Sequence, residues 1–255
     1  MPRGPRKISN TGIYHIILRG INKQNIFMDK EDKLKFIDTL QLYKDKGFYQ
    51  IYGYCLMDNH THSLFKEKDE YIGESLKRIG SSYVFWYNKK YERSGPLFQD
   101  RFKSEAVEDD RYLLSVLRYI HQNPLKAGMV KNIGDYRWSS YNDFLNRRTG
   151  LTDTRFILDL FHVNEQDAIP LFKNFMAQST EEKFLDHDTG RKIKITDEEV
   201  LSYLKQNLST DNLDFLKQLS IQERDIVIRE LKRKGATIKQ LTDLTGLGRR
   251  IIQKA

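Results

Sequence analysis

The order of strand-like and helix-like segments in the first half of the chain is the feature that most constrains its fold. Segments rich in β-branched and aromatic residues predict four strands, at residues 12–19, 49–57, 60–66 and 102–107. Apolar residues at helical spacing predict three helices, at residues 29–43, 72–90 and 110–123, with Pro124 and Gly128 ending the last one. The order β-α-β-β-α-β predicts an α+β domain with a ferredoxin-like antiparallel sheet and helices on one face. The third helix could then lie across the sheet.

Two histidines stand two residues apart at the start of the third predicted strand. Side chains at positions i and i+2 of a strand point to the same face of the sheet, so His60 and His62 can bind one metal ion together. Asp58 and Asn59 predict the turn before them. An ordinary, half-exposed histidine pair is the alternative interpretation.

The third predicted helix carries a phenol and a carboxamide four residues apart. This spacing places Tyr119 and Asn123 on one helix face. If that face lies over the histidine pair, Asn123 can supply a third metal ligand and Tyr119 a nucleophile beside a polarised phosphate. His121 lies on a different helix face, which indicates a structural or DNA-facing role. His15, on the first strand, is expected in the core or at the surface, with a role beside the metal ligands as the alternative.

The composition restricts the class of protein. A chain of 255 residues with 39% apolar content can bury a sizeable core in one or two domains. The single cysteine, Cys55, excludes a disulfide framework and a cysteine-rich zinc site, and it favours a reducing cytoplasm. No apolar run approaches the roughly 20 residues that span a bilayer, and residues 1–7 are basic without the apolar stretch of a signal peptide. We therefore expect a soluble cytoplasmic protein.

The net charge of +8 is unevenly distributed. Residues 1–150 hold 26 Lys and Arg against 18 Asp and Glu, residues 151–190 hold 3 against 8, and residues 191–255 hold 14 against 9. Two basic regions flank an acidic one, which favours contact of both ends with a polyanion. A solvated surface with chance fluctuation of charge is the alternative.

Five motifs in a fixed order carry a resemblance to a known family. They cover residues 14–20, 57–62, 95–104, 119–128 and 136–141. In these motifs the chain resembles the single-tyrosine HUH transposases of the IS200-like type, in particular the branch of REP-associated tyrosine transposases. The resemblance extends over about residues 8–145.

The resemblance implies a metal-dependent endonuclease and strand transferase that acts on single-stranded DNA folded into hairpins. Carried over residue by residue, it implies that His60 and His62 bind Mg²⁺ or Mn²⁺, that Asn123 is the third ligand and that Tyr119 is the nucleophile. Relatives include monomers and dimers that exchange the tyrosine helix, so a monomer and a homodimer are both open.

Two positions depart from the pattern of the family. A bulky apolar residue usually separates the histidines and a proline precedes the asparagine, where this chain has Thr61 and Asp58. Thr61 is expected on the opposite sheet face. Asp58 is either a neutral turn residue or an extra negative charge near the metal.

Basic residues near the fourth predicted strand are candidates for DNA contacts. Arg101 and Lys103 alternate with Phe102 and are predicted to share one strand face, which suits phosphate contacts. Basic and aromatic residues also interleave over residues 82–93, as in surfaces that stack bases, although half of them must form the core face of a helix.

The last 60 residues predict a helix-turn-helix. Helical patterns at residues 222–234, 238–244 and 248–254 are separated by glycines, and the last one carries Arg249, Arg250 and Gln253 on what could be a major-groove helix. A helical pair packed on the catalytic domain is the alternative. We predict three parts: the HUH transposase domain at residues 1–148, a helical and acidic connector at 149–192, and the helical domain with the helix-turn-helix at 193–255.

Other classes of function remain open at this point. A non-catalytic transcriptional regulator would use the helix-turn-helix alone to bind duplex DNA. A ferredoxin-like RNA-binding module would use exposed aromatics on a basic sheet. A hydrolase with a metal-activated water is disfavoured, because no carboxylate cluster accompanies the histidine pair. A replication initiator or relaxase would share the tyrosine chemistry.

Overall fold

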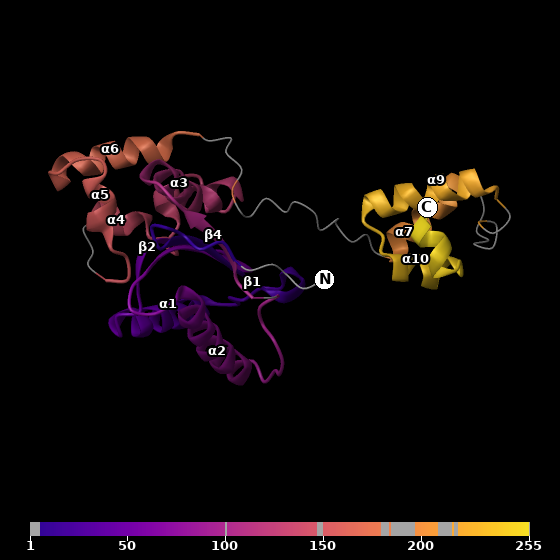
Figure 1. Ribbon diagram of the computed structural model, residues 1–255, viewed down its shortest axis with the longest axis horizontal. Coiled ribbons are helices and arrows are strands. Elements are labelled where there is room, and N and C mark those ends of the chain that lie inside the picture. Colours follow the sequence, from indigo (N-terminus) through magenta and orange to yellow (C-terminus); the bar gives the residue numbers. More distant parts are fainter. Residues whose placement is uncertain are drawn as a thin grey trace. The chain divides into compact units, whose positions relative to one another are not determined.

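The chain forms two separate units in the computed structural model, Met1–His187 and Asp188–Ala255 (Figure 1). The residues that the structure describes are 6–99, 101–146, 150–179, 184, 197–208, 216 and 219–254. Each unit has its own hydrophobic core.

The first unit is built on a four-stranded antiparallel sheet. Its strands are β1 (Ile13–Arg19), β2 (Tyr49–Leu56), β3 (His60–Glu67) and β4 (Lys103–Val107), in the spatial order β2-β3-β1-β4. Helices α1 (Lys30–Asp45) and α2 (Ile72–Lys90) connect them, with a short 3₁₀ turn η1 (Ile21–Lys23) after β1. The predicted α+β class and the antiparallel sheet are confirmed.

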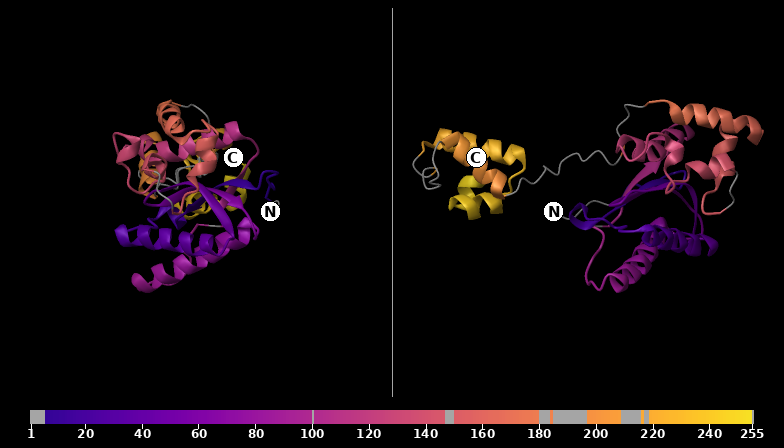
Figure 2. Two further views of the ribbon diagram at one scale, coloured as in Figure 1. Left: turned by 90° about the vertical axis from the view of Figure 1, so that its left-hand side faces the viewer. Right: turned by 180° about the vertical axis from the view of Figure 1, so that it is seen from behind.

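Helices cover both faces of this sheet: the two helices of the β-α-β-β-α-β unit lie on one face, as predicted, and the third helix lies across the other. Figures 1 and 2 show α1 and α2 on one side of the sheet and α3 (Asp110–Lys126) on the other. The physical reason is that alternate strand residues are apolar on both sides. Ile16 and Phe65 pack with α1 and α2, whereas Ile13 and Leu64 pack with α3. An RNA-binding module that reads bases on an open sheet face is therefore excluded.

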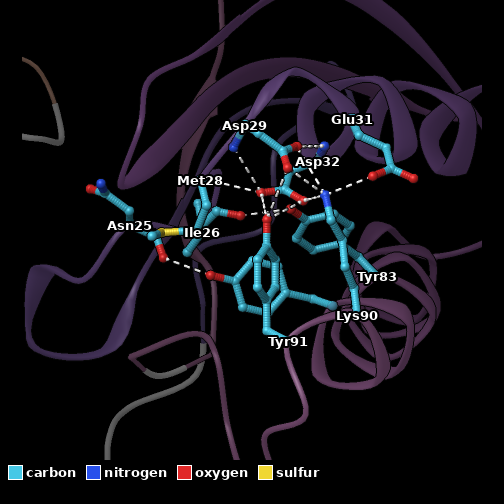
Figure 3. A network of polar contacts seen from close by, with 10 residues as sticks. Asn25, Ile26, Met28, Asp29, Glu31, Asp32, Tyr83, Lys90 and Tyr91 are labelled. Carbon is cyan, nitrogen blue, oxygen red and sulfur yellow. Dashed lines mark hydrogen bonds and ion pairs between the residues drawn. The ribbon is translucent and has the colours of Figure 1, made fainter.

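A buried polar network joins the start of α1 to the end of α2 (Figure 3). Asp32 is fully buried and accepts hydrogen bonds from the backbone N–H of Met28 at 2.6 Å and from Tyr91 Oη at 2.9 Å. Lys90 Nζ lies 2.8 Å from Asp32 and 2.7 Å from Asp29, which caps α1. Burial opposes the charge on Lys90, but the surrounding carboxylates outweigh it and raise its pKa.

Helix α3 runs through Pro124 to Lys126, beyond its predicted end. The helix starts at Asp109, whose carboxylate accepts the N–H of Tyr112 at 2.8 Å. A proline this close to the end removes only one intrahelical donor, and the N–H of Ala127 still bonds the carbonyl of Asn123 at 2.9 Å. Gly128 ends the helix with φ of +69°.

Close packing of α3 on the sheet depends on Gly53. The β2–β3 register shifts between Ile51 and Gly53, and a Cβ on Gly53 would lie 2.2 Å from Leu117 Cδ1. The missing side chain therefore lets the middle of α3 approach β2.

The segment after α3 is attached to the outer edge of β2. Backbone hydrogen bonds join Leu56 N to Trp138 O and Ser140 N to Tyr54 O. His121 Nε2 lies 2.9 Å from Ser140 Oγ and is completely buried, and burial lowers the His121 pKa to about 3. His121 is thus a structural residue of the core.

Several short helices complete the first unit. They are η2 (Ile133–Asp135), α4 (Tyr141–Asn146), α5 (Thr154–Asp159) and α6 (Glu165–Ala177). Phe144, Ile157, Phe172 and Met176 from α4–α6 belong to the same core as α3. The described part of the predicted connector, residues 150–179 and 184, therefore belongs to this unit, while 180–183 and 185–192 lie outside the described residues.

The second unit is helical. It contains α7 (Asp197–Leu208), α9 (Ile221–Lys234), α10 (Ile238–Thr245) and α11 (Arg249–Lys254). The last three lie close to the predicted helical segments, whereas α7 was not predicted. Capping boxes at Ser220 and Thr237 start α9 and α10, and Gly235 and Gly246 end them in the left-handed conformation. Among the described residues of the chain, no helix is long and apolar enough to cross a membrane.

Candidate active site

The structure brings the histidine pair and Tyr119 together between the sheet and α3. His60 and His62 lie on the sheet face that α3 covers, with ring centroids 4.9 Å apart. The Tyr119 ring is perpendicular to His62 with centroids 5.5 Å apart. His60 and His62 thus point to the same face of β3, and α3 places Tyr119 over them, both as predicted.

Asn59 fixes the orientation of His60. The Nδ1 atom of His60 lies 2.6 Å from Asn59 Oδ1, and Asn59 Nδ2 donates to the carbonyl of Lys23 at 3.2 Å. Because a carboxamide oxygen only accepts, His60 carries its proton on Nδ1. Its Nε2 is then the ring nitrogen that presents a lone pair, which is the form that binds a metal.

A third histidine contacts His62. His15 Nε2 on β1 lies 3.1 Å from His62 Nδ1, and the two rings stack with centroids 5.3 Å apart. His15 is fully buried, and its Nδ1 lies 3.8 Å from Oε2 of Glu105 on β4. Glu105 could not be paired with His15 from the sequence alone, because the register of β1 and β4 decides which residues are opposite each other. The signal in the sequence was one histidine in the apolar first strand and one carboxylate in the fourth strand, which made them candidates for a pair.

Tyr119 is largely enclosed. Its side chain is 8% exposed and stacks on Phe184 with ring centroids 4.5 Å apart. Lys126 Nζ lies over the same ring, 5.5 Å from its centroid. Phe184 falls in the predicted connector, and no motif in the sequence indicated this contact.

Asn123 lies one turn beyond Tyr119 on the same helix face and is half-buried. Its Nδ2 is buried without a hydrogen-bond partner among the described residues. Because Nδ2 only donates, it suits an acceptor that the protein alone does not supply, such as a phosphate oxygen, whereas a metal ion would be bound by the carboxamide oxygen Oδ1. Within the described parts of the chain, no three His, Cys, Asp or Glu side chains form a metal-binding group, so a third ligand here would be the carboxamide.

Asp58 and Thr61, the two residues that depart from the pattern of the family, lie in different environments. Asp58 pairs with Lys33 Nζ at 2.9 Å, and Lys33 lies among the rings of Phe27, Tyr136 and Trp138. The lysine thus offsets the negative charge of Asp58 beside the histidines. Thr61 is buried, and strand alternation directs it to the face of the sheet that α1 and α2 cover.

The predicted DNA-contact residues are exposed, with one correction. Lys103 is the first residue of β4, but Arg101 precedes the strand, so the two do not share a strand face. In the interleaved segment 82–93, Tyr83 and Tyr87 are buried in the core, whereas Phe85 is 75% exposed. The exposed side chains of α11 include Arg249, Arg250 and Gln253.

Comparisons with known proteins define the class of this site. Residues 9–123 match the model of the family described as "Transposase IS200 like". The matched range includes the histidine pair, Tyr119 and Asn123. This stretch of the first unit is therefore similar to the IS200-like transposases, a family of enzymes that act on DNA. The predicted resemblance is confirmed.

Two relatives are more specific. The chain is 29% identical over 106 residues to a protein of Haemophilus influenzae named as a REP-associated tyrosine transposase, covering 37% of this chain and 60% of that relative. The chain thus spans about 60% of the length of the relative. A solved structure of a REP-associated tyrosine transposase bound to a REP hairpin aligns with 60% of this chain and 94% of that one, with 16% identity and a TM-score of 0.49.

Proposed function

We propose that this protein is a transposase that cuts and rejoins single-stranded DNA through a covalent bond to Tyr119. The observation that carries the proposal is the placement of the Tyr119 ring against His62, 5.5 Å between centroids, beside a second histidine on the same sheet face. A core tyrosine does not need two imidazoles beside it, whereas a nucleophilic tyrosine can use a metal ion that such a pair would bind.

The residues fit a divalent metal. His60, His62 and Asn123 would hold the ion through two imidazole nitrogens and a carboxamide oxygen, and the resemblance to the family implies that it is Mg²⁺ or Mn²⁺. When bound, the ion supplies Lewis-acid polarisation of the phosphate and stabilises the charge that develops on the leaving oxygen. Asn59 and His15 hold the rings of the two histidines from the other side.

The chemistry of the chain's own residues is a transesterification. Tyr119 Oη attacks the scissile phosphorus and the bond from phosphorus to the leaving 3′ oxygen breaks. The phenol proton is released to solvent and the leaving oxygen takes up one proton from solvent, which gives a 5′-phosphotyrosine and a 3′-OH. A second 3′-OH can then attack the phosphotyrosine and return Tyr119 to the phenol, so rejoining needs no ATP. Lys126 Nζ, 5.5 Å from the centroid of the Tyr119 ring, places a cation beside this residue.

The substrate we propose is single-stranded DNA with a hairpin, of the REP type or from the end of an element. Support comes from the basic charge of residues 1–150 and from the relative whose structure contains a REP hairpin. Arg101 and Lys103 are exposed candidates for phosphate contacts. A cytoplasmic location, and either a monomer or a homodimer, belong to the same proposal.

We further propose that the second unit binds duplex DNA as a helix-turn-helix. Helices α10 and α11 are joined by the turn at Gly246, with Ile252 buried and Arg249, Arg250 and Gln253 exposed. The same exposed helix supports the alternative function, a non-catalytic transcriptional regulator.

The deciding experiment uses a pool of labelled, hairpin-bearing single-stranded DNAs that includes the flanking genomic repeats, with Mg²⁺ or Mn²⁺. We expect a denaturant-stable adduct that requires the metal and disappears in Tyr119→Phe. Tyr112→Phe, a tyrosine of the same helix, is the matched control and should retain the adduct. Binding without an adduct would favour the regulator.

A further inference from the structure

The two histidines of the site are oriented by partners of different chemical character. To bind a metal through Nε2, a histidine must carry its proton on Nδ1. His60 meets this condition because Asn59 Oδ1, 2.6 Å away, only accepts. His62 faces the imidazole of His15 at 3.1 Å, and an imidazole nitrogen can either donate or accept.

We propose that His15 and Glu105 are positioning residues that hold His62 in its metal-binding tautomer. This inference rests on the proposed metal-dependent function. The carboxylate of Glu105, 3.8 Å from His15 Nδ1, favours the proton of His15 on that nitrogen. His15 Nε2 is then an acceptor, and His62 must donate to it from Nδ1. The opposite arrangement would leave the proton of His62 on Nε2, where it blocks coordination.

The strand register explains how these residues meet. His15 on β1 lies directly opposite Glu105 on β4 and Leu64 on β3. His62 is two residues from Leu64, so it is the diagonal neighbour of His15 on the same face. Three adjacent strands thus contribute one residue each to the series Glu105, His15, His62.

The burial of His15 also points to a role. It is 0% exposed, in a strand whose inward positions are otherwise apolar, and its Nδ1 has no hydrogen-bond partner among the described residues. An apolar residue would fill the same space without the cost of a buried polar group. The His15 ring also contacts the edge of Tyr119, with centroids 6.1 Å apart, and so borders both the ligand and the nucleophile.

The first test compares Mn²⁺ affinity in two variants, measured by titration calorimetry on the full chain. His15→Leu removes the acceptor, and we expect Mn²⁺ binding to weaken by about 10-fold to 100-fold. His15→Gln places a carboxamide oxygen near the position of Nε2 and should remain within a few-fold of wild type. Equal affinities for His15→Leu and wild type would overturn the proposal, as would a wild-type protein that does not bind Mn²⁺.

A second measurement keeps the proposal testable if His15→Leu fails to fold. Long-range ¹H–¹⁵N NMR of the wild-type protein without metal reports which nitrogen of His62 is protonated. We expect the proton on Nδ1, and a proton on Nε2 would overturn the proposal. Glu105, whose side chain is 33% exposed, allows a milder change, and Glu105→Leu should shift His62 toward the other tautomer, whereas Glu105→Gln should not.

These readouts separate this inference from the proposed function. Loss of Mn²⁺ affinity in His15→Leu, without any DNA adduct in wild type, would retain the positioning role and reject the transposase chemistry. An adduct that depends on Tyr119, together with unchanged Mn²⁺ affinity in His15→Leu, would retain the chemistry and reject the positioning role.

Discussion

The two faces of the sheet differ in whether their buried polar groups have hydrogen-bond partners. Under α1 and α2, the buried carboxylate of Asp32 is matched by Lys90, Tyr91 and backbone N–H groups. Under α3, His15 and Asn123 each keep a buried polar nitrogen without a hydrogen-bond partner among the described residues. Unsatisfied groups of this kind are common at functional sites, so the comparison supports a stabilising role for the first face and the proposed chemistry for the second.

The largest effect is expected on the stabilising face. Lys90→Met leaves Asp32 buried beside Asp29 and Glu31 without their shared cation, and should lower the free energy of unfolding by about 2–3 kcal/mol. Urea denaturation measures this. The adjacent exposed Lys89→Met is the control and should cost less than about 0.5 kcal/mol. Equal losses in both variants would mean that the network does not hold α1 to α2.

A smaller loss is expected where α3 meets the sheet. Gly53→Ala introduces a Cβ 2.2 Å from Leu117 Cδ1 and should cost about 1–3 kcal/mol by overpacking. It should also reduce adduct formation, because α3 carries Tyr119. Gly150→Ala, with nothing within 4 Å of the new Cβ, is the matched control. Gly53→Ala with wild-type stability would show that α3 can shift without cost.

The face under α3 should also be sensitive to acid through His121. Burial lowers the His121 pKa to about 3, below the roughly 6.5 of an unfolded histidine, so the unfolded state binds the proton first. The stability that the neutral His121 contributes is therefore complete above about pH 6.5 and is lost as the pH falls toward 3. Between pH 6.5 and 5, His121→Gln should reduce the slope of the free energy of unfolding against pH by up to about 1.4 kcal/mol per pH unit.

The matched control for this titration is the exposed His162, whose side chain is 49% accessible. His162→Gln should leave the slope of stability against pH as in wild type. A wild-type slope in His121→Gln would contradict the assignment of the acid sensitivity to this buried ring.

The smallest effect concerns DNA binding outside the site. Lys103→Ala should weaken binding of single-stranded DNA and reduce the slope of log K against log salt by about 0.7, as for one phosphate contact. Fluorescence anisotropy at several salt concentrations measures it. Lys77→Ala, on α2, is the control and should not change the slope. An unchanged slope in Lys103→Ala would remove this residue from the DNA contacts.

Local patterns in the sequence were enough to predict the four strands and the first three helices of the first unit. The β-branched runs and the His60–His62 spacing depend only on neighbouring residues, and the structure has these strands and helices. The extension of α3 past Pro124 was missed, because a proline near the helix end removes only one hydrogen bond.

The parts of the site that escaped prediction depend on contacts distant in sequence. Glu105 meets His15 only through the β1–β4 register, and Phe184 reaches Tyr119 across 65 residues of chain. The sequence allowed the third helix to lie over the histidine face, but strand patterns alone do not show which helix covers which face. Register and helix placement are properties of the whole fold.

The central claim is that Tyr119, among 14 tyrosines, is the residue that bonds DNA. Mass spectrometry of a trypsin and nuclease digest of the adduct tests it most directly, because cleavage after Arg118 and Lys126 isolates a peptide whose only tyrosine is Tyr119. We predict a nucleotide linked through phosphate to that peptide. A nucleotide on any other tyrosine peptide would contradict the account.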